Sequence, residues 1–202
     1  MQASSATPQT DQTQVSTVYQ TEQLAGDTNI IVIGWNNATS NITSVVDSAG
    51  NIYQIAAPVV RGSGISQAIY YANNIKASAA GANTVTVTFN ASTAFVDLRI
   101  TEYSGLDKVN PLDVNQSASG TAATANSGAV TTTAANELLF AAGTTTGSFS
   151  GAGTGFTDRI IISPNADNVE DRLVTALGTY SATAPLSGSA AWVMQLVTFK
   201  AG

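Results

Sequence analysis

The sequence predicts an all-β protein built as a sandwich of two antiparallel sheets, and three observations support this fold class. Apolar and polar residues alternate with a period of two in many short runs, the pattern of strands with one buried face. Gly, Asn, Asp and Ser separate these runs at roughly 8- to 12-residue intervals, as in sandwiches. No helical period lasts beyond one turn, and only residues 106–112 would allow a short helix.

In chain order, the sequence begins with a polar segment and continues as a single domain. Residues 2–14 are polar and have no period, so we expect a linker or a loose terminal arm there and one β-sandwich domain over residues 15–202. Within that domain, Val85, Val87 and Phe89 alternate with Thr residues, which indicates one buried and one wet face. The predicted strands lie near residues 15–23, 28–36, 42–46, 52–58, 65–75, 83–90, 94–103, 126–133, 137–145, 156–163, 169–179 and 190–199.

Two stretches are apolar on both faces, from Ile30 to Trp35 and from Trp192 to Phe199. We expect these to be central strands that are covered on both sides. The segment from Asp47 to Asn51 reads Asp-Ser-Ala-Gly-Asn and lies between two predicted strands. It predicts a turn, because Asp favours the start of a turn, and Gly and Asn tolerate positive φ.

The composition narrows the possible partners. Charged residues make up only 10% of the 202 residues, against about 25% in soluble proteins generally. Such an uncharged polar surface is typical of secreted proteins that act on polar, uncharged partners. The net charge is −6 and the 7 Lys and Arg residues are scattered, so nucleic acid is a poor partner. No apolar run approaches the roughly 20 residues that membrane insertion needs.

These properties predict an extracellular or cell-surface protein. The chain starts with Met1, Gln2 and Ala3 and has neither the basic nor the apolar part of an export signal. The missing signal alone would indicate a cytoplasmic protein. Because the composition favours export, we expect instead a fragment of a larger secreted protein whose export signal or preceding domain was removed.

Catalysis is restricted by what the chain lacks. It contains no Cys and no His, which excludes Ser–His and Cys–His pairs and the usual zinc sites. A catalytic pair of carboxylates, as in glycoside hydrolases, is the type of site that the composition still allows. Glu102 is the acid of interest, because it shares a strand face with Val96, Leu98 and Ile100. A buried carboxylate there is either a catalytic acid or a structural acid held by hydrogen bonds. We expect the structural role and a protein that is not an enzyme.

A structural Ca²⁺ site is a further hypothesis. Asp167, Glu170 and Asp171 are close in sequence and offer the oxygen ligands that Ca²⁺ prefers. Asp107 and Asp113, in a second loop, would be able to join them. The alternative is a solvated turn that leads into a strand, because the spacing does not match an EF-hand.

Aromatic residues suggest a glycan site, because sugars stack their C–H faces on aromatic rings. Trp35 and Trp192 lie in strands that we expect to be covered, so core packing is their predicted role. Adjacent residues of a strand point to opposite faces, so one member of a Tyr pair should point outward. The predicted ligand-binding residues are Tyr70, Tyr71, Gln67, Asn73 and Asn74.

Several phrases occur in one order along the chain: DSAGNIY at 47–53, IYYANNI at 69–75, EYSGLD at 102–107, NPLD at 110–113 and GTYSAT at 178–183. Together they resemble a poorly characterised β-sandwich module of secreted or surface-anchored bacterial proteins. The resemblance covers about residues 25–200. It implies an extracellular location and a jelly-roll-like sandwich, and it carries no catalytic or binding residues over to this chain.

Three functions remain open. The first is a non-catalytic carbohydrate-binding or adhesive module that binds a neutral polysaccharide or glycan. The second is a structural spacer or a self-assembling subunit of an extracellular fibre or surface layer. For that role the polar arm and the run from Val15 to Tyr19 would pair with a neighbour's sheet edge by strand addition. The third is a glycoside hydrolase or lyase.

Overall fold

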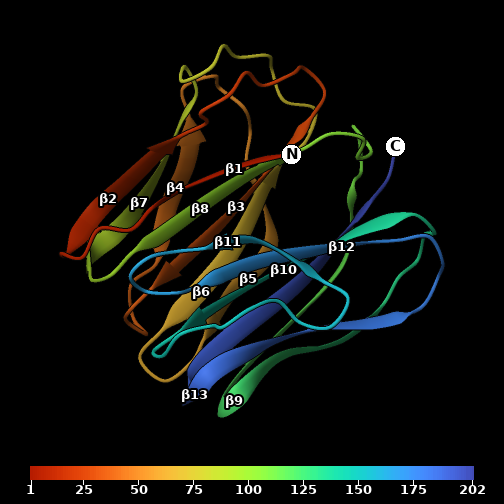
Figure 1. Cartoon of the computed structure of the whole chain (residues 1–202). Coiled ribbons are helices and arrows are strands. Elements are labelled where there is room, and N and C mark those ends of the chain that lie inside the picture. Colours follow the sequence, from red (N-terminus) through yellow and green to blue (C-terminus); the bar gives the residue numbers. More distant parts are fainter.

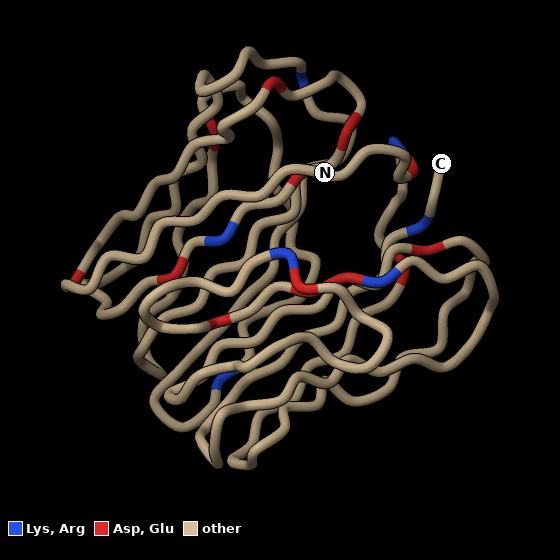
Figure 2. Tube along the Cα trace, viewed as in Figure 1, with Lys and Arg blue, Asp and Glu red and all other residues tan.

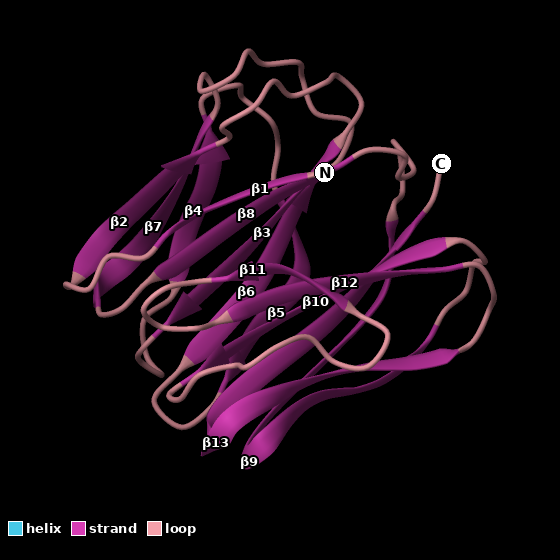
Figure 3. Cartoon of the chain, in the orientation of Figure 1, coloured by secondary structure: helices cyan, strands magenta, loops and turns pink.

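The computed structural model describes all 202 residues and contains thirteen strands and no helix (Figure 3). All strand pairs are antiparallel and form three sheets, so the predicted all-β sandwich is confirmed, with a third sheet in addition to the expected two. None of its segments is a helix long and apolar enough to cross a membrane. The strands are β1 (Gln2–Ala6), β2 (Gln12–Val18), β3 (Thr28–Trp35), β4 (Ile42–Asp47), β5 (Gln54–Arg61), β6 (Ser66–Ala72), β7 (Thr84–Thr93), β8 (Asp97–Tyr103), β9 (Leu112–Thr131), β10 (Glu137–Thr145), β11 (Thr157–Ile161), β12 (Asn168–Val174) and β13 (Thr179–Lys200).

The first eight strands form a jelly roll. Pairing is nested, with β1 beside β8, β2 beside β7 and β3 beside β6, as when one long hairpin is rolled into a sandwich. The chain passes repeatedly between two sheets: a central sheet in the order β1-β8-β3-β6-β5 and a small sheet in the order β2-β7-β4. Figure 1 shows the small sheet stacked on one side of the central sheet.

The last five strands form a C-terminal sheet in the order β11-β12-β10-β13-β9. It packs on the other face of the central sheet, so the molecule has three layers (Figure 1). Every residue of β3 and β10 is buried, which confirms the prediction that Ile30 to Trp35 is a central strand. The second half of β13, from Trp192 to Phe199, is also buried throughout, as predicted.

The central sheet contributes to two separate hydrophobic cores. Ile31, Ile33 and Leu98 point toward the small sheet and pack with its Val85 and Val87. The neighbouring residues of the same strands point the opposite way, toward β10, β12 and β13 of the C-terminal sheet. A third cluster lies on the far face of the C-terminal sheet, where the long strands β9 and β13 fold over it.

Four local expectations differ from the structure. The segment at residues 2–14 is not a loose arm, because β1 pairs along its whole length with β8 and β2 begins at Gln12. The run from Val15 to Tyr19 is used within its own chain, where most of it pairs with β7. Residues 106–112 form no helix. Strands β9 and β13 are far longer than predicted, because Ser, Ala, Thr and Gly in their exposed halves show no apolar period.

The predicted turn at Asp47 to Asn51 is the centre of a polar network at one end of the jelly roll. Gly50 has a φ of 70°, which a glycine adopts without steric cost. The Asp47 carboxylate accepts hydrogen bonds from Asn51 Nδ2 at 2.7 Å, Tyr53 Oη at 2.9 Å and Asn83 Nδ2 at 3.1 Å. These hydrogen bonds lower the pKa of Asp47 against the opposing effect of burial. The network gives the residues of the DSAGNIY phrase a structural role.

Candidate functional site

The tyrosine pair at the centre of the predicted glycan site is covered by other sheets. Tyr70 and Tyr71 do point to opposite faces, as expected. Tyr71 is buried against Phe199, with the ring centroids 5.6 Å apart. Tyr70 is half-buried and packs at the edge of the core between the central and small sheets. Neither ring stands free as a stacking platform, because the central sheet has a neighbour on both sides.

Gln67 is a structural residue and not a ligand-binding one. Its side chain is completely buried. Its Nε2 donates to the Ala142 carbonyl at 2.9 Å and to Gln195 Oε1 at 3.2 Å. It therefore links the central sheet to the C-terminal sheet, and no ligand reaches it.

Asn73 and Asn74 behave differently, because they line a surface hollow of about 420 Å³ at the end of β6. We call it the amide hollow. Asn73 Nδ2 donates to the Lys108 carbonyl at 2.7 Å, while Asn74 is exposed and has a φ of 50°. Its lining consists of Gly50, Asn51, Ile52, Gln54, Asn73, Asn74, Lys76 and Lys108.

The structure does not form the predicted Ca²⁺ site. Asp167 points toward the central sheet, where its Oδ2 lies 3.8 Å from Arg99 Nη2. Asp171 accepts hydrogen bonds from Tyr103 Oη at 2.6 Å and from Arg159 Nε at 2.8 Å. Glu170 lies on the opposite face of β12 and accepts from the Gly153 N–H. Strand alternation thus separates the acids, and no group of three acidic residues in the chain is close enough to hold a metal ion.

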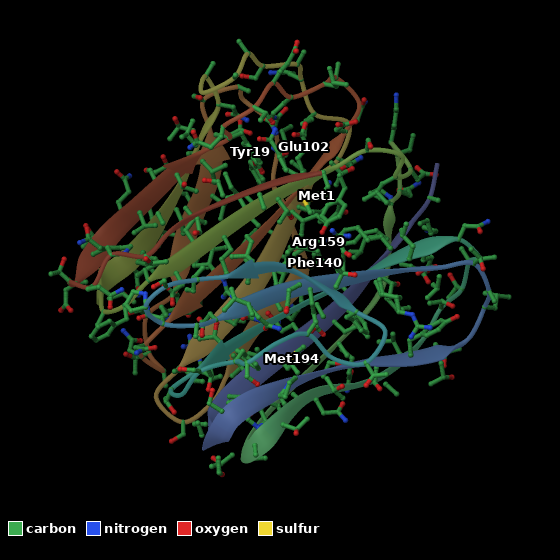
Figure 4. All side chains as sticks on the ribbon, in the orientation of Figure 1. Met1, Tyr19, Glu102, Phe140, Arg159 and Met194 are labelled. Carbon is green, nitrogen blue, oxygen red and sulfur yellow. The ribbon has the colours of Figure 1, made fainter.

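The acids of the second loop also have structural partners. Asp107 accepts from the backbone N–H groups of Val109 and Asn110, and Asp113 accepts from Thr133. Glu102 is buried beside Tyr19 (Figure 4) and accepts a hydrogen bond from Gln2 of β1. Burial raises the pKa of Glu102. Its other carboxylate oxygen, Oε1, is buried without a hydrogen-bond partner, so the structural role of Glu102 stays a prediction.

A buried cation occupies the centre of the interface between the central and C-terminal sheets. Arg99 of β8 is completely buried. Its Nη1 donates to the carbonyls of Gly143 and Asn168, both at 2.8 Å, and its Nη2 donates to Thr144 Oγ1 at 2.9 Å. We call the set Gln67, Arg99, Thr144, Asp167 and Gln195 the polar layer.

The polar layer depends on a glycine in the adjacent strand. Gly34 pairs with Asp97, one of the two acids next to Arg99. A Cβ atom on Gly34 would lie 2.3 Å from Thr144 Oγ1 and 2.8 Å from Arg99 Nη2. Only a residue without a side chain therefore leaves room for the guanidinium at this point.

A second hollow, of about 270 Å³, lies between the ends of β3, β8 and β10. Thr145, which lines it, donates its backbone N–H to Asp167 of the polar layer. Phe95 lies at this hollow with 39% of its side chain exposed and a φ of 47°. A bulky residue with positive φ is strained, and such strain concentrates at functional sites. We call this the Phe95 hollow; it is lined by Asn36, Phe95, Asp97, Thr145, Thr146, Gly147, Pro164 and Asn165.

Asp97 provides the hydrogen-bond acceptor of the Phe95 hollow. Asn165 Nδ2 lies 3.1 Å and 3.0 Å from its two carboxylate oxygens. Burial raises the pKa of Asp97, while the charge of Arg99 and the Asn165 amide oppose that rise. The positive charge of Arg99 thereby favours the charged form of Asp97. An aromatic ring, a carboxylate and side-chain amides at one hollow are the groups that bind a polyhydroxylated ligand.

Sequence reasoning missed Phe95 because residues 94–103 were treated as one strand, whereas β8 begins at Asp97. A usable signal was present. Val96, Leu98 and Ile100 define the apolar face, so Phe95 falls on the polar face with Asp97 and Arg99. A large aromatic residue on that face, next to a strand end, indicates an exposed ring.

Comparison with known proteins gives no match: no family model, no curated protein and no solved structure matches the chain.

Proposed function

We propose that the protein is a non-catalytic, carbohydrate-binding or adhesive module of a secreted bacterial protein, and that the Phe95 hollow is its glycan site. The observation that supports this most directly is the exposed, strained Phe95 beside the carboxylate of Asp97. The low charge of the chain, visible in Figure 2 as few coloured segments on a mostly tan trace, favours a neutral partner. The extracellular location and the resemblance to a surface module are parts of the same proposal.

The binding chemistry divides among three groups. Phe95 stacks on the C–H face of one sugar ring and removes apolar surface from water. The Asp97 carboxylate lines the hollow although only 3% of the residue is exposed, and it would accept hydrogen bonds from hydroxyl groups that reach it beside Asn165. The amides of Asn36 and Asn165 both donate and accept, which suits hydroxyl groups that do both.

The distribution of acids supports binding over hydrolysis. Glycoside hydrolysis needs two carboxyl groups across the bond to be cleaved. The Phe95 hollow has only Asp97 in its lining, and the amide hollow has no acid. Asp167, the acid nearest to Asp97 in the polar layer, is sealed from solvent at 1% exposure.

The proposal predicts weak binding that depends on the ring. One stacking platform with a few hydrogen bonds gives an affinity of about micromolar to millimolar, which is ~4–8 kcal/mol. Phe95→Ala should weaken binding of a neutral plant or microbial polysaccharide about tenfold or more, because it removes the apolar area of the ring and the ~0.5–1.5 kcal/mol that stacking contributes beyond area burial. Calorimetry or affinity electrophoresis against a panel of such polysaccharides measures the affinity of the unmodified protein and of the variant.

Leu177→Ala is the matched control, because Leu177 is a large exposed side chain outside both hollows. It should bind as the unmodified protein does. Binding that survives in Phe95→Ala would remove the hollow from the proposal, and a failure of every neutral polysaccharide to bind would overturn the carbohydrate function itself.

A further inference from the structure

The amide hollow contains an unusual concentration of positive charge. Lys76 and Lys108 are two of the three lysines in the chain, and both line it. No acidic residue is part of that lining. In a protein of net charge −6, two lysines at one hollow without an acid mark the place where an anionic group is most favoured.

Neither lysine is neutralised by an ion pair. The two ion pairs of the chain join Arg99 to Asp167 and Arg159 to Asp171. Burial raises the pKa of Asp27, and the charge of Lys108 opposes that rise from a longer distance without forming an ion pair. The two ammonium groups therefore remain available to a ligand.

Lys76 is held in place and still has donor capacity. Its Nζ donates to the carbonyls of Ala49 at 3.2 Å and Gly50 at 3.0 Å. Its backbone N–H donates to Asn51 Oδ1 at 2.9 Å, which ties it to the polar network of Asp47. Since an ammonium has three N–H donors, one remains for a ligand, and fixing the side chain beforehand lowers the entropy lost on binding.

Lys108 and the amides complete the hollow. Lys108 is exposed and its Nζ lies beside Gly26, which is not part of the lining, so this side chain has to turn toward Lys76 to share a ligand with it. The Asn73 side chain holds the backbone of Lys108 by donating to the Lys108 carbonyl. Asn74 and Gln54 are exposed and offer amide donors and acceptors to hydroxyl groups.

We infer that the amide hollow is a second ligand site, specific for a carboxylate-bearing glycan. The ligand's carboxylate would lie between Lys76 and Lys108, and its hydroxyl groups would contact the amides of Gln54, Asn73 and Asn74. The site is separate from the Phe95 hollow, with which it shares no lining residue. It therefore does not depend on the neutral-glycan proposal.

The test compares polygalacturonate with its fully methyl-esterified form, which has the same backbone without the charge. The protein should bind the acid form and not the ester. Binding should weaken at least fivefold as NaCl rises from about 0.02 M to about 0.2 M, because salt screens exposed charges. Equal binding of the ester would overturn the inference.

Single variants Lys76→Gln and Lys108→Gln should each weaken binding of polygalacturonate by about fivefold or more, the order of one charge-assisted hydrogen bond. Lys200→Gln is the matched control, because it removes the same charge from the third lysine, outside the hollow. An equal loss in Lys200→Gln would show non-specific attraction and overturn the site. Melting temperatures of all three variants exclude misfolding as the cause.

Two further arms locate the site and define its ligand. Phe95→Ala should bind polygalacturonate as the unmodified protein does, and a loss there would move the acidic ligand to the Phe95 hollow. Dextran sulfate should bind more weakly than polygalacturonate. Equal or tighter binding of the sulfated polymer would overturn the preference for a carboxylate.

Discussion

The two faces of the central sheet use different chemistry, although they come from the same strands. The face toward the small sheet is a continuous apolar core, in which Trp35 packs edge-on against Phe89 with the ring centroids 5.4 Å apart. The face toward the C-terminal sheet has apolar flanks but a polar centre around Arg99. Leu98 and Arg99 are adjacent in β8 and point to opposite sides.

The difference suggests that the small sheet and the C-terminal sheet are held against the central sheet in different ways. Apolar packing tolerates many arrangements of similar volume, so the small sheet is fixed mainly by the strand connections of the jelly roll. A buried guanidinium requires particular acceptors, and those of Arg99 come from β10, β12 and β6. We infer that the polar layer fixes the placement of the C-terminal sheet. It also holds Asp97 beside Phe95, so the same contacts shape the proposed glycan site.

The largest expected effect comes from removing the buried cation. Arg99→Met should lower the free energy of unfolding by roughly 3–5 kcal/mol, the usual result of removing one partner of a buried pair. It removes the donor to the carbonyls of Gly143 and Asn168 and the positive charge beside Asp97 and Asp167. Urea denaturation monitored by tryptophan fluorescence measures the change.

Leu98→Ala is the matched variant on the apolar face, with an expected loss of roughly 2–4 kcal/mol from the cavity. The two sites are distinguished by a second substitution. In the double variant with Arg99→Met, the loss in unfolding free energy caused by Asp167→Asn should differ from the sum of the two single losses by roughly 1–3 kcal/mol. In the double variant with Leu98→Ala, the two losses should simply add. Independent addition in both cases would mean that the polar layer does not act as a unit.

A pH-dependent effect of intermediate size comes from the C-terminal sheet. Glu170 is buried, its Oε1 has no hydrogen-bond partner, and burial raises its pKa to about 8. Between its ordinary pKa and about 8, the folded state holds a proton that the unfolded state releases. The free energy of unfolding therefore falls as pH rises through this range. Glu170→Gln should reduce this slope and raise the melting temperature at about pH 9. Part of the slope should persist, because burial also raises the pKa of Asp167 to about 8.

Melting curves at about pH 5, 7 and 9 test this expectation. Glu22→Gln is the control, because Glu22 is exposed and its substitution should leave the slope unchanged. If Glu170→Gln melts with the same pH dependence as the unmodified protein, Glu170 is already ionised in the folded state.

The sequence was informative wherever burial imposed a pattern. Strands β3, β7 and β8 have one or two apolar faces, and the predicted runs overlap each of them. Strand β1 was missed because Gln-Ala-Ser-Ser-Ala buries almost no apolar surface and is held through pairing with β8. The first half of β9 was missed for the same reason. Backbone pairing at an exposed edge leaves no hydrophobic period to detect.

The candidate sites were harder to predict, because they depend on which faces are covered. Of the five predicted ligand-binding residues, Asn73 and Asn74 line a hollow, and Tyr71 and Gln67 are buried. Strand alternation placed the two tyrosines on opposite faces. It did not reveal that a third sheet covers the second face. Arg99 gave a better signal: a cation within an apolar strand requires buried partners.

The smallest expected effect concerns Phe95, where two substitutions should differ in stability but not in binding. Because its φ of 47° suits glycine, Phe95→Gly should relieve strain that Phe95→Ala retains, and the glycine variant should be more stable than the alanine variant by about 1 kcal/mol. Both variants lack the ring, so both should lose binding of neutral polysaccharide equally. Thermal melting and affinity electrophoresis of the two variants side by side separate these effects. An alanine variant as stable as the glycine variant would show that the backbone at Phe95 is not strained, and the glycan site would then depend on the exposed ring and Asp97 alone.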